Sequence, residues 1–211
     1  MRIKYEQSFF NKKNTFCINL DHRTDRLQQF SSEISRINGE FTRFSAINGK
    51  NLEPKLGLSR EQIGCFLSHS SIWKQALKLN LDKVIIFEDD TMFSDDFIDR
   101  FDIFMKEDTS ERQIIRLGAY WPNGELYKKI SSTAGIVTVP AWGAHAYIVK
   151  RDAIKILVNN AEDMIEADYY LYGTLPPAET NLRPGQRSKI HSIPNYVPLK
   201  NLCSQDSDTS F

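Results

Sequence analysis

The run VIIFEDD at residues 84–90 constrains the fold of this chain most, because four apolar residues end directly on three acids. A short apolar run of this kind, bounded by polar residues, predicts a buried strand. A second run, TFCINL at 15–20, predicts another. The acids must then lie where a buried strand emerges from the protein.

Segments with helical spacing separate the apolar runs. We expect strands at 15–20, 41–47, 84–90, 113–119, 135–140 and 144–150 and helices that start near 24, 60, 94 and 152. Ser59 and Gln62 have the spacing of a capping box at the second of these helices. This order predicts an α/β fold with a mainly parallel mixed sheet flanked by helices, in which the last two strands form a hairpin-like pair.

Ligands of such sheets bind outside the carboxyl ends of the strands. We therefore expect the runs at 15–20 and 84–88 to be neighbouring or near-neighbouring strands that end on one edge. Glu88, Asp89 and Asp90 then lie where this architecture places its chemistry.

Three adjacent carboxylates repel one another, and burial would raise their pKa values unless a cation joined them. Residues alternate along a strand, so Glu88 and Asp90 point to one side and Asp89 to the other. Hard oxygen ligands favour Mn²⁺ or Mg²⁺, so we expect Glu88 and Asp90 to be the metal ligands. The alternative is a solvated acidic turn that caps the following helix.

Composition excludes several classes of protein. Lys+Arg and Asp+Glu both number 27, which argues against a protein that binds nucleic-acid phosphates. No segment has the apolar length of a membrane span or the pattern of a signal peptide. The three cysteines, Cys17, Cys65 and Cys203, have no metal-knuckle spacing and are expected as reduced thiols in a cytoplasmic protein.

Six segments in order resemble glycosyltransferase family 25, the bacterial lipooligosaccharide glycosyltransferases related to the collagen galactosyltransferase domain. They are INLDHRTDRLQQF (18–30), RFSAING (43–49), IGCFLSHSSIWKQAL (63–77), VIIFEDD (84–90), IIRLG (114–118) and AYIVKRDAIKIL (146–157). The resemblance implies a GT-A-like nucleotide-sugar fold, a UDP-sugar donor that is often UDP-galactose, and inversion at the anomeric carbon.

The resemblance also implies the partners and the layout of the chain. A single domain at 1–211 would have a nucleotide-sugar half at 15–120 and an acceptor half with a polar tail at 121–211. The acceptor would be a saccharide of the lipooligosaccharide core, met from the cytoplasm in peripheral contact with the inner face of the membrane. The residues expected to bind the donor are Asn19, Asp21, Arg23, Arg26, Ala46, Asn48, Gly49 and Gln62.

Further candidates complete the expected site. Asp168, in EADYYL, matches an acidic residue of the family and could take the proton of the acceptor hydroxyl, with Asp89 and His69 as the other catalytic candidates. His69 lies on the flank of its helix and is expected to face the donor rather than the core. Trp142 and His145 are expected at the acceptor, because sugars stack on aromatic faces. His69 could instead be a packed or surface residue, Trp142 a core residue, and Asp168 an exposed acid early in its helix.

One departure from the family pattern keeps a second function open. The family usually has glutamate before Ile-Gly-Cys, where this chain has Gln62. The alternative is therefore a catalytically inactive member that binds sugar or acts as a scaffold.

Overall fold

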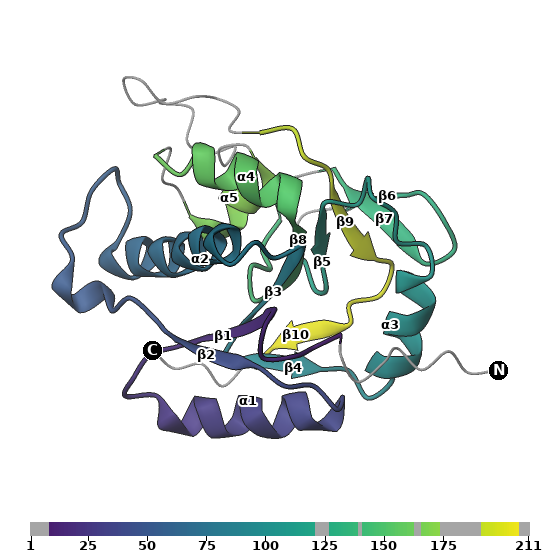
Figure 1. Cartoon of the computed structure of the whole chain (residues 1–211), viewed down its shortest axis with the longest axis horizontal. Helices are drawn as coiled ribbons and strands as arrows, with labels where there is room; N and C mark the ends of the chain where they lie inside the picture. The colour runs from purple at the N-terminus through teal and green to yellow at the C-terminus, as the bar shows by residue number, and fades with distance from the viewer. Residues whose placement is uncertain (1–8, 121–126, 139–140, 163–165, 174–190, 207–211) are drawn as a thin grey trace.

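A mixed sheet covered by helices on both faces forms the centre of the protein (Figure 1). The structure is a computed structural model, and it describes residues 9–120, 127–138, 141–162, 166–173 and 191–206. The α/β class expected from the order of the segments is confirmed.

Most strands belong to this central sheet, and β4 and β10 form a separate ribbon. The strands are β1 (Thr15–Asn19), β2 (Thr42–Ser45), β3 (Lys83–Glu88), β4 (Thr91–Phe93), β5 (Ile114–Arg116), β6 (Tyr127–Lys129), β7 (Ala134–Val137), β8 (Ala146–Lys150), β9 (Asn195–Pro198) and β10 (Cys203–Gln205). The helices are α1 (Thr24–Arg36), η1 (Gly49–Asn51, a 3₁₀ turn), α2 (Arg60–Lys78), α3 (Phe97–Met105), α4 (Arg151–Asn159) and α5 (Ala167–Tyr172).

Two strands of the sheet, β8 and β7, run antiparallel to the others. The order is β2-β1-β3-β8-β5-β9-β7-β6, and β1 runs parallel to both β2 and β3. β8 is antiparallel to its neighbours β3 and β5. Ile18 pairs with Glu88, so β1 and β3 are direct neighbours that end on the same edge, as the sequence predicts.

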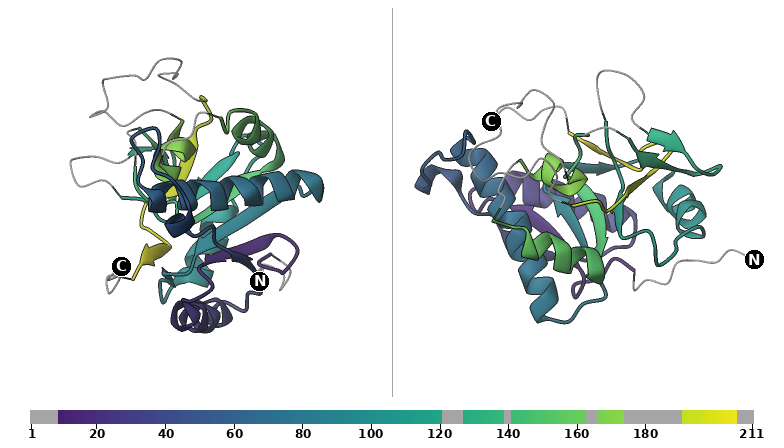
Figure 2. Two further views of the ribbon diagram at one scale, coloured as in Figure 1. Left: turned by 90° about the vertical axis from the view of Figure 1, so that its left-hand side faces the viewer. Right: turned by 90° about the horizontal axis from the view of Figure 1, so that it is seen from above.

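Alternation along β1 and β3 divides the core into two layers. Phe16, Val84 and Ile86 point to the face that α2, α4 and α5 cover. Cys17, Ile85 and Phe87 point to the face that α1 and α3 cover, as Figure 2 lets the reader follow from the end and from above. Both layers are mainly apolar, and the buried Asn19 and Asp89 lie at the ends of β1 and β3.

The expected hairpin of 135–140 and 144–150 is wrong. β7 pairs with β6 and β9, whereas β8 lies between β3 and β5. Gly143, with φ at +128°, adopts a backbone conformation that favours glycine just before β8 enters the centre of the sheet. Residues 139–140 of the expected strand lie outside the described residues.

Helix α2 begins as its sequence predicts. The Ser59 side chain accepts from the Gln62 backbone amide, and the Gln62 side chain accepts from the Ser59 amide. In the described part of the chain, no helix has the length and apolar character needed to span a membrane.

Candidate active site

Asp89, directly after β3, is held by the neighbouring strand and helix. Its carboxylate accepts a hydrogen bond from Nδ2 of Asn19 at 2.6 Å and lies 3.5 Å from a guanidinium nitrogen of Arg26. Burial raises the pKa of Asp89, and the Glu88 carboxylate adds to the rise, while Asn19 and Arg26 oppose it. The sequence-predicted residues Asn19, Arg26 and Asp89 therefore form one cluster.

Arg43 on β2 extends this cluster toward solvent. It donates to Oδ1 of Asn19 at 2.8 Å and forms an ion pair with Asp21 at 2.5 Å. Arg23 instead pairs with the exposed Asp25 at 2.9 Å. Of the two arginines expected at a diphosphate, Arg26 turns inward to the acids and Arg23 stays at the rim.

The segment after β2 approaches α2 closely. The Ala46 amide donates to the carbonyl of Asn19 at 2.9 Å, and the Asn48 side chain caps η1. A Cβ on Gly49 would lie 2.5 Å from the carbonyl oxygen of Arg60, so only glycine fits there. Ala46, Asn48 and Gly49 thus border the same edge as Asn19, and their expected contact with a donor stays a prediction.

Gln62 has a second partner besides its helix cap. Its Nε2 donates to the carboxylate of Glu166, the residue before α5. A glutamate at position 62 would bring two carboxylates together here. Glutamine at position 62 therefore forms a hydrogen bond with Glu166 where the family's usual glutamate would be repelled by it.

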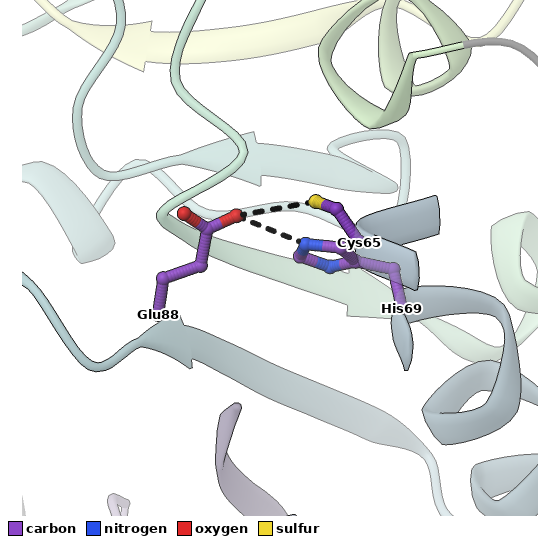
Figure 3. Close-up of side chains that lie close together, drawn as sticks. All are labelled: Cys65, His69 and Glu88. Atoms are coloured by element: carbon purple, nitrogen blue, oxygen red, sulfur yellow. Dashed lines mark hydrogen bonds and ion pairs between the residues drawn. The ribbon is translucent and has the colours of Figure 1, made fainter. Parts of the chain in front are cut away.

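Glu88 points to the opposite face from Asp89, toward α2. Its Oε1 lies 3.1 Å from Nε2 of His69 and 3.9 Å from Sγ of Cys65 (Figure 3). Burial opposes ionisation of Glu88, but the hydrogen bond with His69 outweighs it, so the pKa of Glu88 is lowered. The expectation that all three acids have raised pKa values is wrong for Glu88, because of this partner.

His69 is fully buried, so the expectation that it lies outside the core is wrong. Its Nδ1 lies 2.8 Å from the hydroxyl of Tyr147, which also accepts a hydrogen bond from Nε1 of Trp73 at 3.1 Å. The imidazole nevertheless reaches the acidic edge through Glu88, because α2 packs directly on β3. His69 is thus a core residue and a neighbour of the acids at once.

Among the three acids, Asp90 is the one with a buried carboxylate oxygen, Oδ1, that has no hydrogen-bond partner in the described residues. Burial, followed by the charges of Glu88 and Asp89, raises the pKa of Asp90 to about 7. An orphaned buried carboxylate oxygen is the feature that a hard cation would satisfy. Asp90, together with Glu88 whose charge acts on it, therefore fits the expected Mn²⁺ or Mg²⁺.

His145 and Trp142 lie in different surroundings. His145 is 1% exposed, and neither of its ring nitrogens makes a well-formed hydrogen bond to the described residues. Its expected place at an acceptor surface is wrong, because its ring packs inward against Gly118. Trp142 is 36% exposed and packs edge-on against Tyr120, which is 46% exposed, with ring centroids 5.5 Å apart. An exposed aromatic pair of this kind suits a sugar ring.

Asp168 anchors the loop that carries Trp142. Its Oδ1 accepts hydrogen bonds from the backbone amides of Gly143 and Ala144 at 2.8 and 2.6 Å. Arg116, fully buried in β5, donates to the backbone carbonyl of Asp168 at 2.7 Å and to that of Ala141 at 2.8 Å. The loop at 141–144 and the start of α5 are therefore fixed to the sheet.

The carboxylates of Glu88, Asp90 and Asp168 all act on the pKa of the same neighbouring side chain. After burial, Asp168, Asp90 and Glu88 all raise the pKa of Tyr120. Burial also lowers the pKa of His145, while Glu88 and Asp168 act in the opposite direction. The structure thus brings Asp168 into electrostatic range of the acids after β3, although they are far apart in sequence.

The sequence profile of glycosyltransferase family 25, described as an LPS biosynthesis protein, matches residues 12–171. The chain belongs to glycosyltransferase family 25. The match contains both the acids after β3 and Asp168.

The chain is also similar to curated family 25 proteins. It is 28% identical over 204 residues to the human inactive glycosyltransferase 25 family member 3, covering 85% of this chain and 33% of that protein. It is 33% identical over 110 residues to procollagen galactosyltransferase 1-B of Xenopus laevis, covering 43% of this chain and 17% of that protein. The chain thus spans about a third or less of the curated relatives it matches.

Two solved structures show a more distant likeness. One is a glycosyltransferase involved in glycosylation of the major capsid of PBCV-1, at 12% identity with a TM-score of 0.45, covering 73% of this chain and 66% of that one. The other is a Drosophila galactosyltransferase 7 mutant in complex with manganese, UDP-Gal and xylobiose, at 9% identity with a TM-score of 0.37, covering 68% and 50%.

Several residues of the site were not predicted from the sequence. Cys65 could have been found, because it precedes His69 by four residues and so shares a helix face with it. Arg116 carried a signal too, as the one charge within the apolar run IIRLG. Tyr120 carried none, because its place depends on the pairing of its backbone with that of Trp142.

Proposed function

We propose that this chain transfers a hexose, galactose in the first instance, from a UDP-sugar to a hydroxyl of a saccharide acceptor, with inversion. The observation that carries the proposal is the buried Oδ1 of Asp90, which has no hydrogen-bond partner among the described residues, at the carboxyl edge of a family 25 sheet and two residues after Glu88. A cation there would stabilise the diphosphate as it leaves. Asp90 and Glu88 are the residues that would hold it.

The chain's own groups then have distinct roles. Arg26, ion-paired with Asp89, presents positive charge beside the expected diphosphate, and Asn19 fixes that pair. Asp168 is the proposed base: the two backbone amides that bind its Oδ1 orient the carboxylate, and its second oxygen would take the proton of the acceptor hydroxyl. Tyr120 and Trp142 offer aromatic faces to the acceptor sugar.

The names of relatives support the choice of sugars. Similarity to procollagen galactosyltransferases favours galactose as the transferred hexose. The LPS biosynthesis description of the family favours a lipooligosaccharide core as the acceptor. We propose a cytoplasmic protein that meets this acceptor at the inner face of the membrane.

A catalytically inactive, sugar-binding protein is the second candidate. The observation in its favour is the 28% identity to the human inactive member over most of this chain. Such a protein would bind a UDP-sugar without cleaving it.

Hydrolysis of UDP-galactose by the purified chain, with Mn²⁺ and with a chelator, tests both candidates. We expect turnover in Mn²⁺ only, and a loss of about a thousandfold for Asp90→Asn, because the leaving diphosphate loses its stabilisation. Asp99→Asn, a change of an exposed acid on α3, is the matched control and should keep full activity. Full turnover in chelator would refute the metal role.

Thermal unfolding with a panel of UDP-sugars separates the remaining outcomes. A ligand that binds only the native state raises its melting temperature. A rise with UDP-galactose but no hydrolysis or transfer would identify the inactive member. The absence of any rise with every UDP-sugar would refute both candidates.

A further inference from the structure

Cys65, His69 and Glu88 bring three different metal-binding atoms together. The sulfur, the ring nitrogen and the carboxylate oxygen all lie within 4.8 Å of one another (Figure 3). Cys65 and His69 are one helical turn apart on α2, and Glu88 ends β3. The three side chains thus come from two elements that the core holds rigidly against each other.

The donor set differs from that of the hard cation expected at Asp90. Thiolate and imidazole are ligands that zinc prefers, whereas manganese and magnesium prefer oxygen. We propose that Cys65, His69 and Glu88 form a Zn²⁺ site that is distinct from the donor-side metal. Three protein ligands leave the fourth tetrahedral position to water.

The distances suit such an ion after a small adjustment. Ligands at about 2.0–2.3 Å from zinc in a tetrahedral site lie about 3.4 Å from one another. Oε1 of Glu88 is 3.1 Å from Nε2 of His69 and 3.9 Å from Sγ of Cys65. The sulfur and the ring nitrogen, at most 4.8 Å apart, approach further by a rotation of the half-buried Cys65 side chain.

The surroundings of His69 match those of a metal-binding histidine. Such a histidine is oriented by a hydrogen bond at its other ring nitrogen, and Tyr147 provides that bond here. On binding zinc, the thiol of Cys65 gives its proton to solvent, and the His69 proton moves from Nε2 to Nδ1, where it faces the oxygen of Tyr147. One proton leaves for each ion bound.

The site has a consequence for transfer. Glu88 would serve both cations, so zinc bound by Cys65 and His69 takes away a carboxylate oxygen that the donor-side metal needs. Zn²⁺ would therefore inhibit a manganese-dependent reaction.

Cobalt spectroscopy on the free protein tests the site without any sugar donor. Co²⁺ replaces Zn²⁺, and its bond to a thiolate gives an intense near-ultraviolet charge-transfer band. We expect this band in the wild type, its loss in Cys65→Ser with at least a hundredfold weaker binding, and its displacement by added Zn²⁺. Tyr147→Phe should weaken binding about tenfold and keep the band.

Cys17→Ala is the matched control, because Cys17 is buried on the opposite face of the sheet and should leave the band unchanged. A second measurement uses unmutated protein: Zn²⁺, but not Mn²⁺, should protect the Cys65 thiol from an alkylating reagent. Cobalt bound without a thiolate band, or equal alkylation of Cys65 with and without Zn²⁺, would overturn the site. Neither result bears on sugar transfer, so the two proposals fail separately.

Discussion

Replacing Asp90 by asparagine changes how the stability of the metal-free protein depends on pH. Burial and the neighbouring acids raise the pKa of Asp90 from an ordinary value of 3.8 to about 7. The native state then holds a proton that the unfolded chain has lost. Wild-type stability should therefore fall as pH rises from about 4 to about 7 and stay low above that.

The size of this fall follows from the two pKa values. One pKa unit corresponds to about 1.4 kcal/mol, so the gap between 3.8 and about 7 corresponds to about 4 kcal/mol. Asparagine does not titrate and removes this contribution. Its buried amide lacks the partners that it needs, which costs about 1–3 kcal/mol, but this cost is the same at every pH.

The measurement is urea unfolding of wild type and Asp90→Asn at about pH 4 and about pH 8 in a chelator. We expect the difference in unfolding free energy between the two proteins to change by about 4 kcal/mol in favour of the variant at the higher pH. Mn²⁺ should restore the wild type at high pH and leave the variant unchanged. Stability profiles that run parallel within about 1 kcal/mol would refute the reasoning.

Three further changes test the positioning of the site. Ser59→Ala removes a helix cap and should cost about 1 kcal/mol in urea unfolding, and no loss would contradict the role of the capping box. Arg116→Met leaves three acceptors without a donor and should lower the free energy of unfolding by about 3 kcal/mol or more. Asp168→Asn keeps the backbone carbonyl that Arg116 binds and should lower it less. Trp142→Ala should raise the acceptor KM up to about tenfold while the rate of donor hydrolysis and the stability stay close to wild type, and an unchanged KM would exclude Trp142 from the acceptor site.

The elements that the sequence predicts well are those whose signal is local. The unbroken apolar runs predict β1, β3 and β8, and the capping box predicts the start of α2. Strands β4 and β10 were not predicted, because each is short and β10 pairs with a partner about a hundred residues away. Pairing at that distance leaves no periodic pattern in the sequence.

The sequence predicts the direction in which side chains of the site point better than it predicts their contacts. Alternation along β3 correctly sends Glu88 and Asp89 to opposite faces, toward His69 and Asn19 respectively. A helical wheel places His69 on a flank but does not show that α2 lies against β3 closely enough to bury it. The sequence also does not show that the ring of His145 points inward, because that depends on how β8 enters the sheet.

The insertion of β8 between β3 and β5 governs the order in which this chain can fold. During synthesis β3 gains its partner β1 early, but β5 pairs only with β8 and β9, both of which follow it in the chain. Strand β5 therefore has no partner in the sheet until residues 146–150 of β8 have been synthesised. The backbone bond from the Glu88 amide to the carbonyl of His145 forms at the same stage, because His145 precedes β8 directly. Strands β3, β4 and β5 thus each wait for a partner made later in the chain, so a chaperone that shields exposed strand edges would act there.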